Sequence, residues 1–297
     1  MDIIPINPIK QFELLFDPQL QFTLIRKEGL AGRIRQYSIR GMAWMALLGV
    51  IQPPNSGQTL SEAMAIWTKE IQKTRDEYTQ LKESTSVNPN QESAEDLLMN
   101  NPLSNHQDST WAKYFEDNEL KLEIQRDVVR TFQEMEFFKD PETQKALLEA
   151  LFIYAKGHSI RYKQGIHELL APLYYTLVHE RRDINIPTLN TSEDDVLRAK
   201  VEFLQFVHDP QYVVHDAYAL LSQILIRTSD WFLSGVRKNP ETSTTNPNDS
   251  FFGKMELAEL TPISQRCKLI YDMLLQHEPQ LYHHFKQIQL EPQFYLL

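Results

Sequence analysis

Apolar side chains recur at helical spacing along almost the whole chain, which leaves little room for any other secondary structure. Within residues 60–81 large apolar side chains follow a spacing near 3.5 residues, so that they lie on one face of a long helix. Strand-like alternation is weak, and only 9 of the 297 residues are glycine, less than half of the usual ~7%. The sequence therefore predicts an all-α fold.

Capping signals bound several of the expected helices. Thr59 with Glu62 forms a capping box. Asp140 is a suitable N-cap with Pro141 at the first helical position, and Gly157 ends that helix. We expect helices at about residues 34–51, from 59, at 141–157, from 166, near 193–207, 210–227 and 262–277, and a last one toward 289.

The first expected helix carries a charged and aromatic pair. Arg40 precedes Trp44 by four residues, so its guanidinium can lie along the indole ring. Trp44, Leu47, Leu48 and Ile51 share one apolar stripe, which predicts the core face of this helix. We interpret the Arg–Trp pair as a structural anchor and not as a ligand site.

Charge and cysteine content exclude several classes of protein. The chain has 30 basic and 40 acidic side chains, a formal net charge of −10. This balance disfavours a general nucleic-acid-binding protein, because no basic excess is available for phosphates. The single cysteine, Cys267, excludes an intrachain disulfide and a thiolate metal cage, and the histidines lack acidic partners at ligand spacing. We expect no metal site.

The familiar motifs of self-contained enzymes are also missing. The sequence has no P-loop, no dinucleotide fingerprint, no zinc-protease motif and no nucleophile elbow. The start of the chain lacks a targeting peptide, and no apolar run approaches the ~20 residues that cross a bilayer. These absences predict a cytoplasmic protein without a transmembrane segment.

Two polar stretches interrupt the helical pattern, at about residues 83–110 and 233–260. The first contains a turn at Pro102-Leu103 with a single large apolar residue at its tip. Leu103 either folds back onto the domain or remains exposed for the pocket of a partner, as a small binding hot spot. Both alternatives remain open from the sequence.

Three short motifs occur in order at helical intervals. They are Arg40-x-x-x-Trp44, Ile124-x-x-Asp127-x-x-Arg130 and Tyr162-x-Gln164-Gly165. Together they resemble the signature of the TBC-domain Rab GTPase-activating proteins, over about residues 29–297. Further segments resemble the retromer-associated, endosomal subfamily, in which His167-Glu168 follows the glycine where many TBC proteins carry Met-Asn. These segments are Asp96–Ser104, Trp111, Arg130–Phe132, Tyr162–Pro172 and His215–Ala219.

The resemblance implies a role for each residue of the last two motifs. Arg130 would enter the nucleotide site of the GTPase in trans, a contribution worth roughly 10³–10⁵ in rate for GTPases generally. Gln164 would orient the attacking water in place of the glutamine of the GTPase. Asp127 would orient the guanidinium, Tyr162 would support the loop, and Gly165 would let the backbone approach the partner.

The resemblance also implies partners and location. The chain would be an activator and not itself an enzyme, with no cofactor of its own, because the partner Rab GTPase carries GTP and magnesium. A late-endosomal Rab is the expected substrate, and Pro102-Leu103 would bind retromer, which places the protein at the periphery of endosomal membranes. The alternative is a catalytically inactive scaffold that binds retromer through the Asn-Pro-Leu loop.

Domain boundaries follow from the same resemblance. Residues 1–20 would be an N-terminal flank and residues 21–297 the Rab-GAP TBC domain, with the two polar stretches as loop insertions. TBC domains continue past the segment at 291–297 into further helices. We therefore expect a complete N-terminal lobe and a truncated C-terminal lobe.

Overall fold

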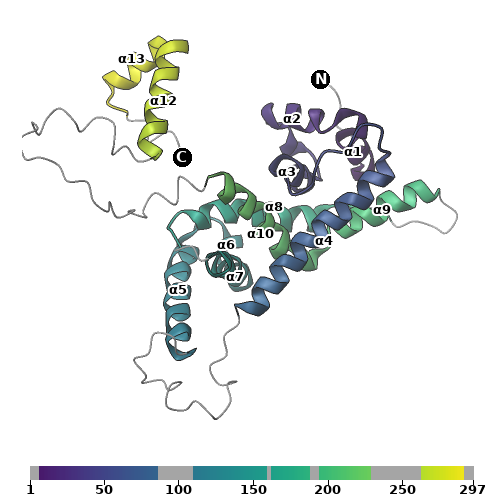
Figure 1. Cartoon of the computed structure of the whole chain (residues 1–297), viewed down its shortest axis with the longest axis horizontal. Helices are drawn as coiled ribbons and strands as arrows, with labels where there is room; N and C mark the ends of the chain where they lie inside the picture. The colour runs from purple at the N-terminus through teal and green to yellow at the C-terminus, as the bar shows by residue number, and fades with distance from the viewer. Residues whose placement is uncertain (1–6, 86–109, 159–161, 188–193, 229–261, 291–297) are drawn as a thin grey trace, which may run out of the picture. The chain divides into compact units, whose positions relative to one another are not determined.

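Every described element of the structure is helical, and none of the described residues forms a β-strand, so the predicted all-α fold class is confirmed (Figure 1). The chain divides into two compact units, residues 1–224 and 225–297. The computed structural model describes residues 7–85, 110–158, 162–187, 194–228 and 262–290.

The described elements are, in chain order, α1 (Pro8–Leu15), η1 (Pro18–Leu20), α2 (Thr23–Leu30), η2 (Ile34–Gln36), α3 (Arg40–Leu48), α4 (Leu60–Ser84), α5 (Thr110–Arg130), α6 (Glu136–Lys139), α7 (Pro141–Gly157), α8 (Ile166–Asp183), α9 (Asp195–Val207), η4 (Pro210–Tyr212), α10 (Val213–Arg227), α12 (Pro262–His277) and α13 (Pro279–Gln287). The two predicted loop insertions lie almost wholly outside the described residues. A shortened second lobe remains a prediction.

Local capping chemistry fixes helix starts where the sequence predicted them. The Thr59 hydroxyl accepts the Glu62 amide at 3.3 Å, and the Glu62 carboxylate accepts the Thr59 amide at 2.8 Å, which completes the capping box of α4. Asp140 Oδ2 accepts the amide of Thr143 at 2.8 Å, with Pro141 at the first position of α7. Such bonds satisfy amides that the helix itself leaves unpaired.

The expected first helix at 34–51 is wrong in its extent and its buried face. The structure has the short 3₁₀ turn η2 followed by α3, which ends at Leu48. Leu47 is 38% exposed, and Trp44 and Leu48 are only half-buried. Because α3 is apolar nearly all round, the period of its sequence could not identify the side that meets the core. The residues actually buried on α3 are Gly41, Met42, Ala43, Met45 and Ala46.

An aromatic cluster joins the N-terminal helices to α4 and α9. The Trp67 ring of α4 lies 5.6 Å from Phe16, 5.8 Å from Phe22 and 6.2 Å from Phe203 of α9, between ring centroids. Phe12 of α1 lies 5.5 Å from Phe203. Part of the segment that the sequence analysis sets apart as a flank is therefore packed into the core. Buried aromatic rings of this size contribute strongly to stability.

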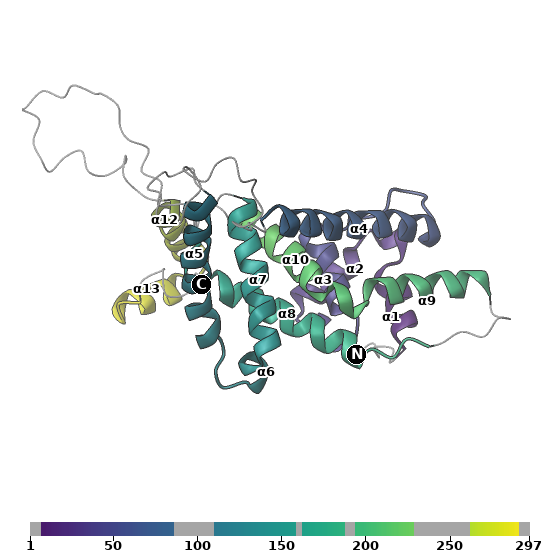
Figure 2. The same cartoon turned by 90° about the horizontal axis from the view of Figure 1, so that it is seen from below.

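Helices α5, α7 and α8 form the layer that carries the candidate site. α5 packs along α7, α7 packs on α8, and α8 also contacts α3 (Figures 1 and 2). Leu147 and Leu151 of α7 and Leu170 and Leu177 of α8 are buried, at the spacing that places apolar side chains on one face of a helix. α8 thus connects the site at its N-terminus to the rest of the core at its C-terminus.

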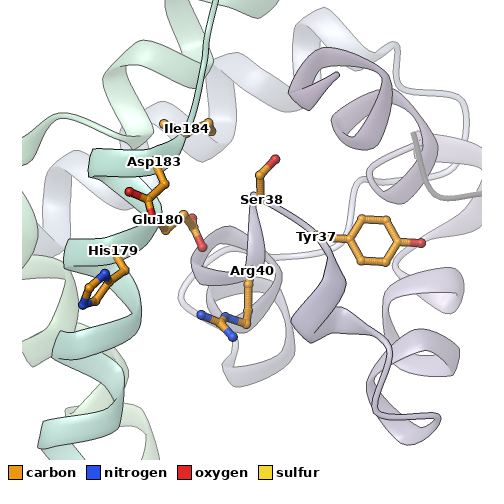
Figure 3. A pocket seen from close by; sticks show the side chains of 7 residues that line it. All are labelled: Tyr37, Ser38, Arg40, His179, Glu180, Asp183 and Ile184. Carbon is orange, nitrogen blue, oxygen red and sulfur yellow. The ribbon is translucent and has the colours of Figure 1, made fainter. Parts of the chain in front are cut away.

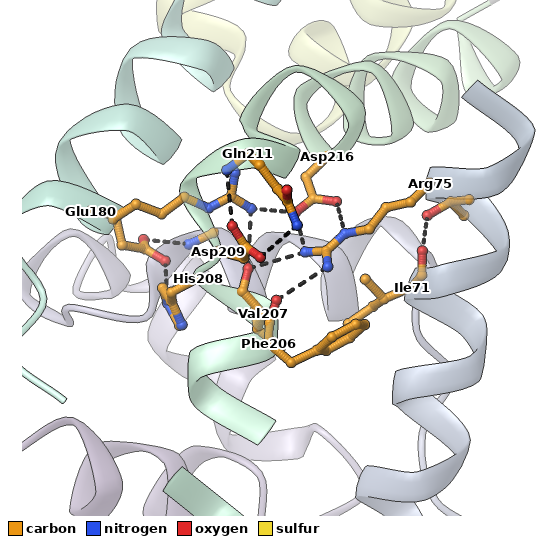
Figure 4. A network of polar contacts seen from close by, with 12 residues as sticks. Ile71, Arg75, Glu180, Phe206, Val207, His208, Asp209, Gln211 and Asp216 are labelled. Carbon is orange, nitrogen blue, oxygen red and sulfur yellow. Dashed lines mark hydrogen bonds and ion pairs between the residues drawn. The ribbon is translucent and has the colours of Figure 1, made fainter. Parts of the chain in front are cut away.

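A buried charge network holds the C-terminal end of α8 (Figure 4). Asp216 of α10 accepts Nε and Nη2 of Arg75 from α4 at 2.9 and 2.8 Å, and also Nη2 of Arg181 from α8. All three side chains are at most 3% exposed. The same two arginines donate to the carbonyl of Val207 at 3.2 and 3.1 Å. The network fixes α4, α8, α9 and α10 against one another.

The second unit contains α12 and α13, which pack against each other. Tyr271 of α12 donates to the carbonyl of Leu290 at 3.2 Å, and its ring lies 5.6 Å from that of Tyr282 on α13. The bounds of α12 coincide with the predicted range. Across the described ranges, no helix is both long and apolar enough to traverse a bilayer.

Candidate functional site

Arg130 is the last residue of α5, and its guanidinium is tied back to the preceding turn. Its Nη2 donates to Asp127 Oδ1 at 2.5 Å. The Asp127 side chain is only 9% exposed, whereas that of Arg130 is 50% exposed. A surface ion pair would contribute little, but here the carboxylate is fixed in the protein while the guanidinium remains accessible. In this geometry Asp127 holds the guanidinium, and its orienting role in catalysis stays a prediction.

Tyr162 links this pair to the loop that precedes α8. Its hydroxyl donates to Asp127 Oδ2 at 3.0 Å, across 35 residues of sequence. Burial, and after it the negative charge of Asp127, raises the pKa of Tyr162, so the hydroxyl stays protonated and can donate. One oxygen of the Asp127 carboxylate therefore holds Arg130 of its own motif, and the other holds Tyr162 of the motif that follows.

Gln164 lies two residues beyond Tyr162, and its side chain is exposed. The next residue, Gly165, caps α8 with φ +104°, a conformation that side chains with a Cβ rarely adopt. No atom lies within 4 Å of the place a Cβ would take, so the backbone angle and not space requires glycine. The loop consequently presents its glutamine outward.

His167 lies beneath this loop in the first turn of α8 and is 2% exposed. Its Nδ1 accepts the Gly165 amide at 3.3 Å and lies 3.2 Å from the Tyr162 oxygen. Burial lowers the pKa of His167, although Asp127 opposes that shift. The sequence marked His167 only as a residue typical of a subfamily, and its contacts depend on tertiary structure.

The end of α5 also brings apolar side chains beside Arg130, which sequence reasoning missed. Val129 is 47% exposed and Phe132 is 37% exposed. Thr131 donates its hydroxyl to the carbonyl of Asp127 at 2.9 Å, and Phe132 turns the chain with φ +40°. The available signal was the run of apolar residues around a lone arginine. Exposed apolar side chains therefore flank Arg130 along the chain.

The Arg40 and Trp44 pair lies near the other end of α8. The Arg40 guanidinium is 5.6 Å from the Trp44 ring centre, the contact expected from their spacing. Arg40 also lines a cavity of about 180 Å³ between α3 and α8, together with His179 and Glu180 (Figure 3). The part of α8 from Ile166 to His179 separates this cavity from the Gln164 loop by about 20 Å. Arg40 and Trp44 are thus remote from Arg130.

The remaining predicted site residues, Pro102 and Leu103, lie outside the described residues. Within the described ranges, no group of three or more His, Cys, Asp or Glu side chains is placed to hold a metal ion. The geometry therefore brings together five of the predicted residues: Asp127, Arg130, Tyr162, Gln164 and Gly165.

Chemically, this site offers a permanently charged planar donor and a carboxamide on accessible positions joined by one buried carboxylate. Such groups stabilise charge and orient water on another molecule. The Rab-GTPase-TBC domain family matches residues 37–240, a range that contains the whole site. The chain belongs to this family.

Two mammalian TBC proteins are similar to this chain over nearly its whole length. The chain is 34% identical to TBC1 domain family member 5 of Homo sapiens over 292 residues, which is 96% of this chain and 34% of that protein. It is 32% identical to the Mus musculus protein of the same name, over 97% of this chain and 34% of that protein. The chain thus spans about a third of the length of these relatives.

A solved TBC structure supports the fold. The Ypt/Rab-GAP domain of Gyp1p matches 96% of this chain and 69% of that domain, with a TM-score of 0.55 and 16% sequence identity. At this identity the likeness bears on the fold alone. The structural likeness therefore shows the fold, and the family match shows membership of the Rab-GAP family.

Proposed function

We propose that this TBC domain accelerates GTP hydrolysis by a Rab GTPase, with Arg130 and Gln164 as catalytic residues donated in trans. The observation that carries the proposal is the shared carboxylate of Asp127. It binds Arg130 at 2.5 Å and Tyr162 at 3.0 Å, so one buried group holds Arg130 and also the residue two positions before Gln164. Both remain accessible to a partner.

The chemistry follows from what a small GTPase lacks. Hydrolysis is slow because charge developing on the β- and γ-phosphate oxygens is poorly stabilised and the attacking water is poorly held. The Arg130 guanidinium supplies a permanent positive charge and a planar set of donors to those oxygens. The Gln164 carboxamide both donates and accepts, which suits it to orient a water. GTP and magnesium belong to the GTPase.

Single-turnover hydrolysis tests these roles. We expect Arg130→Ala to lower stimulated hydrolysis by roughly 10³-fold or more while binding of the Rab loaded with a non-hydrolysable GTP analogue changes little. Arg126→Ala is the matched control, because Arg126 is an exposed arginine one turn earlier on α5. Equal stimulation by wild type and Arg130→Ala would exclude the role of Arg130.

Gln164 has its own comparison. Gln164→Ala should lower the rate of the chemical step, because the water loses its orienting group. Gln125→Ala removes an exposed glutamine from α5 and serves as the control. A loss of the same size in both variants would contradict a specific role for Gln164.

The substrate we propose is a late-endosomal Rab, with the protein at the cytoplasmic periphery of endosomal membranes. Support comes from the sequence likeness to the endosomal TBC subfamily and from the identity to TBC1 domain family member 5. A panel of GTP-loaded Rabs, assayed with the same chain, ranks the substrates. Stronger stimulation of Rabs from other compartments would remove this assignment.

We also propose that Pro102-Leu103 binds retromer. Leu103→Glu should abolish capture by purified retromer and leave the thermal unfolding of the domain unchanged. Leu122→Glu is the control, since Leu122 is a 55% exposed leucine on α5. Retromer capture by a chain that stimulates none of the Rabs would favour the inactive scaffold.

A further inference from the structure

His167 stands out among the buried titratable groups because it contacts both ends of the Gln164 loop. Its Nδ1 lies 3.2 Å from the Tyr162 hydroxyl before Gln164 and 3.3 Å from the Gly165 amide after it. The same atom is 3.5 Å from Asp127 Oδ2. The side chain is 2% exposed, so it makes these contacts from within the protein and cannot reach a partner.

The hydrogen bonds define the protonation state of the ring. A backbone amide can only donate, so the contact with Gly165 requires an unprotonated Nδ1. The Tyr162 hydroxyl proton lies between two acceptors, Asp127 Oδ2 and this nitrogen. The proton of the neutral imidazole is therefore on Nε2, which lies 3.8 Å from Glu168 Oε1.

We propose that His167 is a positioning residue for the glutamine: its unprotonated Nδ1 holds the Gly165 amide and so fixes the direction in which Gln164 leaves the protein. This inference rests on the proposed function. Gln164 has no buried part of its own to fix it, because its side chain is exposed. After Gln164, the chain is anchored by His167, which accepts the Gly165 amide. Before Gln164, the chain is anchored at Tyr162, whose hydroxyl donates to Asp127. A misplacement of about 1 Å at a reacting group can cost roughly 10²-fold in rate.

The position is sensitive to protonation because the ring accepts where a protonated ring would donate. A proton on Nδ1 would face the Gly165 amide donor and remove that hydrogen bond. The charged groups around the ring are Asp127 and Arg130 on α5 and Glu168 on α8, and the neutral phenol of Tyr162 also faces it. Asp127 and Glu168 favour the protonated ring, whereas burial and Arg130 disfavour it.

Two substitutions distinguish the role of His167 as a hydrogen-bond acceptor from its role in packing. In His167→Asn the side-chain oxygen occupies the place of Nδ1 and still accepts the Gly165 amide. In His167→Gln the oxygen occupies the place of Nε2, so an acceptor is present at the wrong position. We expect His167→Asn to retain most of the stimulated hydrolysis. We expect His167→Gln to lose roughly 10- to 100-fold in kcat with KM within about twofold of wild type.

Hydrogen exchange of the Gly165 amide provides a readout that needs no GTPase. By NMR on the full chain, this amide should exchange at least about 10-fold faster in His167→Gln than in wild type or His167→Asn. Equal exchange in both variants would overturn the inference. If exchange is as expected but wild type does not stimulate GTP hydrolysis, the proposed function is wrong. The role of His167 in holding the Gly165 amide would then still hold.

The pH profile adds a second test should His167→Gln fold poorly. Stimulated kcat of wild type should fall as pH drops below 6.5, the ordinary pKa of histidine, relative to intrinsic hydrolysis by the same Rab, because His167 becomes protonated. His167→Asn does not titrate, so its stimulated rate should stay level over that range. Parallel profiles for the two proteins would refute the acceptor role of His167.

Discussion

Substitution of Asp216 by asparagine should destabilise this TBC domain more than any change of one surface charge. The carboxylate is fully buried and is the common acceptor for two buried guanidiniums, Arg75 and Arg181. Burial lowers the pKa of Arg181, which the charge of Asp216 counteracts. Asparagine preserves the shape and one acceptor oxygen but removes the negative charge. Two positive charges would then remain buried without a counterion in the network.

Removing one partner of a buried ion pair costs about 3–5 kcal/mol, because the other charge stays buried. Domains of ordinary stability have about 5–15 kcal/mol in total. With a urea m-value of about 3 kcal/mol/M, the loss corresponds to a midpoint lower by about 1–1.7 M. The measurement is urea unfolding followed by far-UV circular dichroism.

Glu136→Ala is the control, because Glu136 pairs with Lys139 at 2.6 Å while 87% exposed. A surface change of this kind should alter stability by no more than about 0.5 kcal/mol. If Asp216→Asn shifts the urea midpoint no further than Glu136→Ala, the network does not hold α4, α8 and α10 together as argued. The reasoning from buried charge would then be wrong for this domain.

Three further predictions concern local features. Thr59→Ala removes the cap of α4 and should cost about 1 kcal/mol by urea unfolding; no loss would contradict the capping box. Gly41→Ala places a Cβ 2.5 Å from Leu177 Cδ2, so we expect a loss of about 1–3 kcal/mol, and an unchanged melting temperature would show that the contact relaxes freely. Burial lowers the pKa of His215 below 6.5, so stability should decline as pH falls through 6.5, and His215→Gln should flatten that decline in urea midpoints measured against pH.

Local signals in the sequence sufficed for most of the fold. Some signals act within a few turns of one helix, so they can be recognised without tertiary structure. Examples are the capping box at Thr59, the N-cap Asp140 and the spacing within α8. The extent and the buried face of α3 could not be predicted in this way. An apolar helix surrounded by neighbours has no polar face to mark its orientation.

Only part of the candidate site could be predicted from the sequence. The spacing of Asp127 and Arg130 within one helix predicts their contact, because residues three apart are neighbours on one face of a helix. The roles of these residues remain proposals that hydrolysis assays must test. Val129, Phe132 and the acceptor role of His167 were missed, since exposure and a hydrogen bond to a loop amide are properties of the folded chain.

By itself, the sequence determined that this protein is helical, where α4, α7, α8 and α12 begin, and which family it resembles, because these depend on caps, motifs and their spacing along the chain. Tertiary structure alone decided that Tyr162 reaches Asp127 across 35 residues, and that Arg75 meets Asp216 across 141. Those pairings form only when distant helices pack together. Packing then buries both partners, and a buried charge or hydroxyl is stable only when it is paired.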